Sequence, residues 1–444
     1  MDIVEHGVHL FNDDEKAYIT PEKDVCDKLA RWQDLKLGFM VHFGVYSQWG
    51  IVESWALSDD DAEWSRADVP FLGDSLKEKY ARLNTTFDPV MFDPGSWAEA
   101  AADGGFRYFI FTTKHHDGFA MYDTKFSDYK ITSANCPYSN NPNADISRVL
   151  FDSFREKGLS VGVYFSKPDW NSPFYWEPGK PGRYPSRGPT YSPLEDPGKW
   201  EKFKQFTHNQ INELMSDYGP VDVLWLDGGW VNPASGQDID MKQIAENARK
   251  KQPGLIVVDR TVGGPYENYV TPEQLVPKTP ILIPWESNIT MGTSFSYKFD
   301  DEYKSERELI HLLIDVVAKG GNLVLNAGAQ PDGSLPKPAL ARMKALGTWL
   351  QRFGEGIYNT RACAPYRVGS LGFAKNGDRT FVFKMLAENE PVKELFVPYA
   401  KPVASVTMLG RGCPLRYTHH NNTICIDIPP LEPEEQIAFA VVIE

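Results

Sequence analysis

Short apolar runs alternate with amphipathic stretches along most of the chain, a pattern typical of folds that repeat a strand and a helix. The amphipathic stretches at residues 146–157 and 302–319 place apolar side chains at helical spacing. The apolar runs predict strands at residues 37–43, 108–113, 159–165, 221–226, 255–258, 281–283 and 323–325. This alternation predicts a (β/α)8-like, TIM-type barrel in which one of the eight strands is missed or degenerate.

The pattern changes after Leu350. From there to the end, short strands between turns are expected without helices, at residues 381–384, 394–398, 404–408, 423–428 and 437–443. Such a run of short strands is typical of an antiparallel β-sandwich. We therefore predict a catalytic barrel over residues 1–355 and a C-terminal sandwich over residues 356–444.

Polar side chains follow the predicted barrel strands. The clearest case is Asp227, which ends the run 221–226 and is followed by two glycines and Trp230. Catalytic groups of such barrels collect at the carboxyl ends of the strands. Five other predicted strands also end in polar or charged groups, namely His42, 114–119, Tyr164, 259–260 and 285–286. Together they indicate a pocket that hydrogen-bonds several hydroxyls, and a carboxylate beside an indole suits sugar chemistry.

The segment 167–197 is rich in proline, glycine and aromatic residues, and it follows the third predicted strand. Long loops without secondary structure inside compact domains are usually functional. We expect this segment to face the substrate.

Composition narrows the class of protein. The net charge of −14 argues against nucleic acids and anionic membranes as partners. The five scattered cysteines have no metal or CxxC spacing, which predicts free thiols and favours a bacterial or cytosolic protein over a secreted animal one. No run is long enough to span a bilayer, and residues 1–6 lack a signal pattern. A cytoplasmic location is expected, or a periplasmic or extracellular one if a signal peptide has been removed.

Several separate motifs resemble those of the α-L-fucosidases of glycoside hydrolase family 29. They are Lys36-Leu-Gly-Phe-Met-Val-His-Phe-Gly44, Lys114-His-His-Asp-Gly-Phe119, Trp225-Leu-Asp-Gly-Gly229, Lys319-Gly-Gly-Asn-Leu-Val-Leu-Asn-Ala-Gly328 with Asp332-Gly333, and Gly354-Glu-Gly-Ile-Tyr358. The resemblance covers nearly the whole chain. It implies a distorted (β/α)8 barrel with a β-sandwich, hydrolysis of terminal α-L-fucosyl residues from glycans with retention, and no metal or other cofactor.

Carried over by position, the resemblance puts the fucose-contacting groups on His42, Trp55, His115, His116, Tyr164, Trp225 and Arg260. The histidines and the arginine are expected to donate hydrogen bonds to sugar hydroxyls. Two positions depart from the family pattern: Ser54 separates Glu53 from Trp55, and Phe295 stands where many relatives have tryptophan.

Two carboxyl groups are expected to carry the reaction. Asp227 is predicted to be the nucleophile, with Asp222 as a fallback at the wrong end of the strand. Glu286 is predicted to be the general acid/base, because it follows an apolar run and Trp285, surroundings that raise a carboxyl pKa by desolvation. Its competitors are Glu53, Glu267 and Glu273.

Three other functions remain as hypotheses. A metal-dependent hydrolase would use His115, His116 and Asp117, although neighbouring residues of a strand point to opposite faces. A non-catalytic sugar-binding relative would have lost one carboxylate, but both candidates are present. A retaining α-L-galactosidase or related α-glycosidase would act on a fucose-like sugar, because an apolar pocket rejects an added hydroxyl only weakly.

Overall fold

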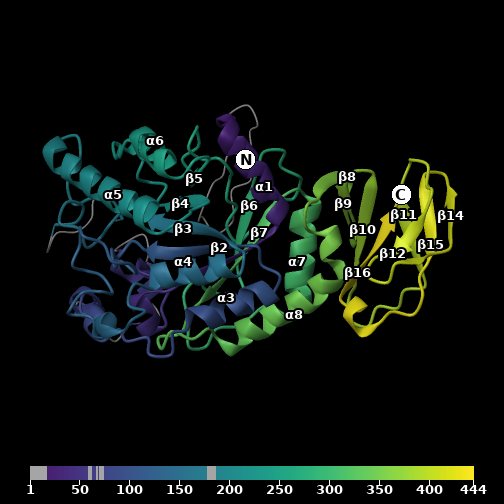
Figure 1. Cartoon of the computed structure of the whole chain (residues 1–444), viewed down its shortest axis with the longest axis horizontal. Coiled ribbons are helices and arrows are strands. Elements are labelled where there is room, and N and C mark those ends of the chain that lie inside the picture. Colours follow the sequence, from purple (N-terminus) through teal and green to yellow (C-terminus); the bar gives the residue numbers. More distant parts are fainter. Residues whose placement is uncertain (1–17, 59–62, 67–68, 70–74, 178–186) are drawn as a thin grey trace.

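The computed structural model describes residues 18–58, 63–66, 69, 75–177 and 187–444. A curled parallel sheet with helices packed around it forms the larger part, and antiparallel strands form the smaller C-terminal part (Figure 1). Helices α7 and α8 lie between the two parts, and α7 contacts the first strands of the C-terminal part. The predicted fold class, a (β/α)8-like barrel followed by a β-sandwich, is confirmed.

The parallel sheet has the order β5-β4-β3-β2-β1-β7-β6 in the described residues. Its strands are β1 Leu37–His42, β2 Tyr108–Lys114, β3 Ser160–Ser166, β4 Val223–Asp227, β5 Ile256–Asp259, β6 Glu286–Thr290 and β7 Asn322–Gly328. The helices are α1 Lys23–Leu35, α2 Leu76–Tyr80, α3 Pro94–Asp103, α4 Ile146–Glu156, α5 Pro197–Asp217, α6 Met241–Lys251, α7 Glu306–Ala318 and α8 Lys337–Phe353. Nearly every strand residue is buried, which explains why these strands read as continuous apolar runs.

The eighth strand is replaced by an irregular segment between β5 and β6. Residues 267–273 make isolated bridges to both edges: Glu267 pairs with Val258 of β5, and Glu273 pairs with Asn288 of β6. The segment therefore fills the space between the edge strands without being a strand itself. This agrees with the expectation that one strand is missed or degenerate.

One predicted strand is wrong. Residues 281–283 lie in an irregular stretch, and the sixth strand starts three residues later, at Glu286. The strand sequence Glu-Ser-Asn-Ile-Thr is mostly polar, so a search for apolar runs passes over it. The consequence is large, because a residue expected at the carboxyl end of this strand stands at its beginning.

The C-terminal part consists of two antiparallel sheets, ordered β13-β12-β16-β10-β9-β8 and β11-β15-β14. Its strands are β8 Arg361–Val368, β9 Leu371–Asn376, β10 Arg379–Met385, β11 Glu394–Pro398, β12 Val406–Met408, β13 Cys413–Pro414, β14 Tyr417–His420, β15 Thr423–Asp427 and β16 Ala438–Ile443. The domain boundary predicted after residue 355 falls in the short 3-10 turn Gly354–Gly356. All five cysteines are free thiols, as predicted. None of the described helices has the length and apolar character needed to span a membrane.

Candidate active site

Strand β4 brings Trp225 and Asp227 to one side of the sheet, because alternate residues of a strand share a face. Asp227 is the last residue of the strand. Its Oδ2 accepts a hydrogen bond from the Tyr164 hydroxyl at 2.6 Å, and its Oδ1 accepts from the Gly228 backbone at 2.8 Å and from Arg260 at 3.2 Å. These donors stabilise a negative charge on the carboxylate.

Arg260 joins two carboxylates. Its Nη1 contacts Asp227, and its Nη2 forms an ion pair with Glu273, a residue of the irregular segment that closes the barrel. The guanidinium also lies over the Trp225 ring, 4.7 Å from its centre. Because one guanidinium contacts both acids, Asp227 and Glu273 stand on two sides of the same cation. Glu273 was only one of several competitors in the sequence.

A cavity of about 540 Å³ opens over these groups. Six of the seven predicted sugar-contacting residues line it, namely His42, Trp55, His115, Tyr164, Trp225 and Arg260, together with Asp227. The seventh, His116, is buried beside the wall, with its ring 5.1 Å from those of Trp55 and Trp230. Glu53, Glu273, Asn288 and Phe295 also line the cavity. A pocket of this size accommodates a sugar and part of the group attached to it.

The hydrogen bonds of two histidines fix their tautomers. Nδ1 of His42 lies 2.6 Å from Oδ1 of Asn326, an oxygen that can only accept, so His42 carries its proton on Nδ1. Nδ1 of His116 lies 2.7 Å from the Ser166 hydroxyl, which donates its hydrogen bond to the Pro168 carbonyl. Ser166 must therefore accept from His116. In both neutral rings, Nε2 is an acceptor.

Burial lowers the pKa of His42 to about 4 and that of His116 to about 3, so both rings are neutral near pH 7. Burial and the neighbouring His116 also lower the pKa of His115. In these tautomers, Nε2 of neutral His42 and His116 can accept a hydrogen bond but cannot donate one. These tautomers differ from the expectation that the two histidines donate to a sugar, because each Nδ1 proton is already held by Asn326 or Ser166.

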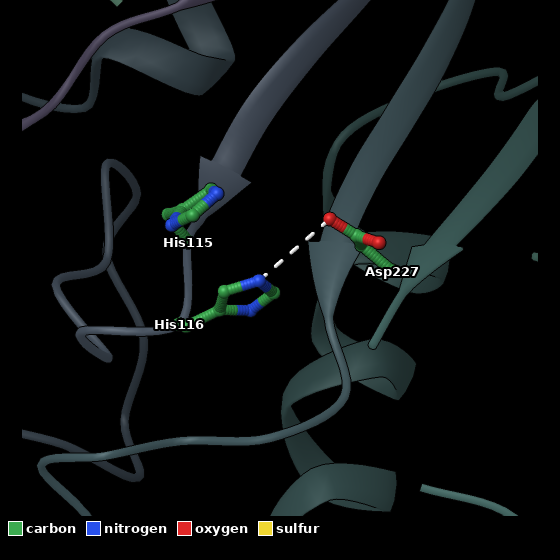
Figure 2. A group of neighbouring side chains, drawn as sticks. All are labelled: His115, His116 and Asp227. Carbon is green, nitrogen blue, oxygen red and sulfur yellow. Dashed lines mark ion pairs between the residues drawn. The ribbon is translucent and has the colours of Figure 1, made fainter. Parts of the chain in front are cut away.

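His115 and His116 both turn toward Asp227 (Figure 2). Strand β2 ends at Lys114, so the alternation of a strand does not apply to these two residues. Their nearest ring nitrogens and a carboxylate oxygen of Asp227 all lie within 4.8 Å of one another. The argument that the two rings must diverge is thus wrong. The third member of the hypothetical metal site is also corrected, because Asp117 instead accepts from the Tyr80 hydroxyl at 2.8 Å.

The loop after β3 packs against this wall through a buried ion pair. The Lys114 ammonium lies 3.0 Å from Asp169, and both side chains are almost fully buried. The Arg187 guanidinium lies 5.1 Å from the Trp55 ring centre and 5.0 Å from that of Trp230. Arg187 lines the cavity, which agrees with the hypothesis that this loop faces the substrate. Residues 178–186 of the loop lie outside the described residues.

Glu286, the predicted acid/base, does not line the cavity. As the first residue of β6 it lies inside the barrel, fully buried, where it accepts hydrogen bonds from the hydroxyls of Tyr108 at 2.6 Å and Tyr269 at 3.2 Å. Burial raises its pKa to about 7, against the opposing effect of these hydroxyls and of the Trp225 indole. Desolvation was expected from the sequence, but the shifted strand start puts the group below the floor of the pocket.

The raised pKa of Glu286 predicts a pH-dependent effect of Glu286→Gln on stability. The folded protein binds this proton more tightly than the unfolded chain, so wild type loses stability as pH rises from about 4.5 to about 7. Glutamine does not titrate. Chemical denaturation should therefore show the variant gaining on wild type by on the order of 3 kcal/mol between pH 4.5 and pH 8. A difference that does not change with pH would contradict this assignment of the shift.

The three other candidate glutamates differ in whether they line the cavity. Glu267 accepts hydrogen bonds from the backbones of Thr261 and Gly263, at 3.0 and 2.7 Å, and so holds the loop after β5. Glu53 lines the cavity, and burial raises its pKa to about 8 although the Ser296 backbone donates to it at 2.7 Å. Among the described residues, Glu53 and Glu273 are thus the glutamates that line the cavity together with Asp227.

A parallel barrel with a carboxylate at a strand end and two further glutamates in the same aromatic cavity is the arrangement of a glycoside hydrolase. Residues 9–355 match the family model of alpha-L-fucosidase. The chain belongs to this family.

Individual relatives match along most of the chain. An alpha-L-fucosidase of Branchiostoma floridae is 27% identical over 421 residues, which cover 89% of this chain and 88% of that protein. The crystal structure of Thermotoga maritima alpha-fucosidase is 26% identical with a TM-score of 0.77, covering 96% of this chain and 100% of that one. The structure of a bacterial fucosidase with an inhibitor, a triazole that carries a dihydroxylated methylpyrrolidine, is 25% identical with a TM-score of 0.78. The match covers 96% of this chain and 95% of that one. Because animals and bacteria both provide relatives, bacterial origin stays a prediction.

Proposed function

We propose that this protein removes terminal α-L-fucosyl residues from oligosaccharides or glycoconjugates with retention of configuration. The observation that carries the proposal is the position of Asp227, at a strand end, in the cavity, among donors that keep it charged. In the first step its carboxylate attacks the anomeric carbon and the glycosidic oxygen leaves. In the second step water hydrolyses the covalent glycosyl-enzyme. Family membership supports fucose as the sugar.

We propose Glu273 as the general acid/base in place of Glu286. It shares the Arg260 guanidinium with Asp227, which supports a short separation between the carboxyls, as a retaining enzyme needs. The shared cation also suits the change of role. When Asp227 becomes an ester, Arg260 stabilises ionised Glu273, the form that activates water.

Glu53 is the second candidate for this role. Its favouring observation is the raised pKa, about 8, of a carboxyl group that lines the same cavity, because a general acid must hold its proton at neutral pH. The same burial makes the ionised form, needed for the second step, costly. Azide rescue of the two variants separates the candidates, as argued in the Discussion.

We propose that the sugar hydroxyls donate to Nε2 of His42 and His116 and that the aromatic rings cover the apolar face of the sugar. His42→Ala and His116→Ala are each expected to weaken a fucose-like iminosugar by about 1–3 kcal/mol per lost buried hydrogen bond. Inhibition constants of both variants measure this. As a control, His419→Ala in β14 of the sandwich should leave the inhibition constant unchanged. Unchanged constants in both site variants would assign these side chains to the core.

The function is tested with matched aryl glycosides. The protein should hydrolyse an aryl α-L-fucoside faster than the aryl α-L-galactoside, which differs by one hydroxyl at C6, and proton NMR should show α-L-fucose as the first product. A panel of fucosylated oligosaccharides then identifies the preferred linkage. A first product with inverted configuration, or faster cleavage of the galactoside, would refute the proposal as stated.

A further inference from the structure

The two histidines and the carboxylate of Figure 2 form a donor set that suits a transition metal as well as a sugar. Two imidazole nitrogens and one carboxylate oxygen are the protein ligands of several zinc sites that keep positions open for water. We propose that Zn²⁺ binds to His115, His116 and Asp227 and reversibly blocks the active site. Its role as an inhibitor rests on the proposed function, whereas its binding does not.

The ligand atoms are prepared by neighbours. The Ser166 hydroxyl donates a hydrogen bond to the Pro168 carbonyl and accepts one from Nδ1 of His116, so Nε2 carries the lone pair, 3.8 Å from Oδ2 of Asp227. The Ser54 hydroxyl lies 2.6 Å from Nδ1 of His115 and can hold that ring in the same way. Histidine ligands of metals usually have such a partner on the other ring nitrogen, because it fixes the tautomer and the ring orientation.

One of these atoms has an unmet bonding capacity. His116 is fully buried, and within the described part of the chain its Nε2 has no hydrogen-bond partner. The same atom lies 3.8 Å from Oδ2 of Asp227. A buried polar atom without a partner is costly, so it favours any ligand that supplies one. A metal ion placed between Nε2 and Oδ2 would give Nε2 of His116 the partner that it lacks.

Geometry requires only a small adjustment. Zinc binds nitrogen and oxygen at about 2.0–2.2 Å, so tetrahedral donor atoms lie about 3.5 Å apart. The three donors here lie within 4.8 Å, and small side-chain rotations of His115 can close the difference. The Arg260 guanidinium contacts Oδ1 of Asp227 and opposes a cation, but the paired Glu273 carboxylate offsets that charge. Magnesium and calcium are disfavoured because they prefer oxygen ligands alone.

Binding is tested by titrating the metal-free protein with Zn²⁺ in a calorimeter. Wild type should bind a single strong Zn²⁺ ion. His116→Ala and Ser166→Ala should each weaken binding by at least about tenfold, the second because it removes only the partner of a ligand. His419→Ala, in β14, should bind as wild type does. Equal affinity in wild type and His116→Ala would overturn the proposal.

Cysteine binding is the rival explanation, and cobalt distinguishes it. Co²⁺ bound by two histidines and an aspartate should show visible d–d bands without the thiolate charge-transfer band that any of the five free cysteines would add. A thiolate band that titrates with the strong site would also overturn the proposal.

Inhibition is tested with the aryl α-L-fucoside. Zn²⁺ should raise the apparent KM without changing kcat, and excess chelator should restore the starting rate. Activity that Zn²⁺ leaves unchanged, in a protein that binds it, would overturn the inhibitory role and leave the proposed function standing. Zinc binding that is lost in His116→Ala, in a protein that hydrolyses no fucoside, would refute the proposed function and leave the metal site standing.

Discussion

Asp227→Asn is expected to lower kcat on an aryl α-L-fucoside by several orders of magnitude while thermal unfolding stays near that of wild type. Asparagine keeps the shape of the side chain and can still form hydrogen bonds with Tyr164 and Arg260. Its amide, however, is too weak a nucleophile to form the covalent glycosyl-enzyme. Steady-state kinetics measure the loss of kcat, and calorimetry checks that the variant is folded. Turnover near the wild-type rate would refute the assignment of Asp227.

Product stereochemistry gives a sharper test in Asp227→Gly, where the removed side chain leaves room for a small anion. Azide should then attack in place of Asp227 in a single displacement and release the β-L-fucosyl azide. Asp222→Asn is the matched control, because Asp222 precedes the same strand at its opposite end, 3.1 Å from Lys28. It should keep wild-type kcat and give no azide product. A kcat loss as large in Asp222→Asn would point to disruption of β4 instead of loss of the nucleophile.

Most of the fold could be predicted because buried parallel strands are continuous apolar runs. Strands β1 to β5 and β7 begin or end within a few residues of the predicted ranges. The strand β6, Glu-Ser-Asn-Ile-Thr, was not predicted, because its polar side chains form hydrogen bonds inside the barrel or face the cavity. Its burial therefore leaves no run of apolar residues. The segment 267–273, which closes the barrel, was not predicted for a different reason: it pairs with its neighbours only through isolated bridges.

These two failures explain why the site was predicted unevenly. His42, Tyr164, Trp225 and Asp227 all stand at ends of strands that the apolar pattern identifies, and they line one cavity. Glu273 stands on the segment that is not a regular strand. A possible signal was the short spacing between Arg260 and Glu273, a cation and an acid on consecutive parts of the barrel edge, but charge pairs at such spacing are common in surface loops. The tautomers of the histidines depend on Asn326 and Ser166, distant in sequence, and could be read only from the structure.

Glu273→Ala is expected to slow natural fucosides, whose leaving groups need a proton, far more than activated aryl fucosides, which leave without one. Deglycosylation becomes limiting for the aryl substrate, since no base activates water. Azide needs no base, so it should restore aryl fucoside turnover and release the α-L-fucosyl azide, the product of two displacements. This anomer is opposite to that expected from Asp227→Gly, so the two azide products distinguish nucleophile from acid/base in one assay.

Variants of three glutamates make the test specific. Glu286→Gln should keep both substrate classes near wild-type rates and show no azide effect, because its carboxyl lies beneath the pocket with Tyr108 and Tyr269. Glu53→Gln should weaken catalysis without azide rescue if Glu53 only shapes the cavity. Rescue in Glu53→Gln with none in Glu273→Ala would transfer the acid/base role to Glu53. Loss of both substrate classes to the same extent in Glu273→Ala, with azide ineffective, would instead reduce Glu273 to a partner that positions Arg260.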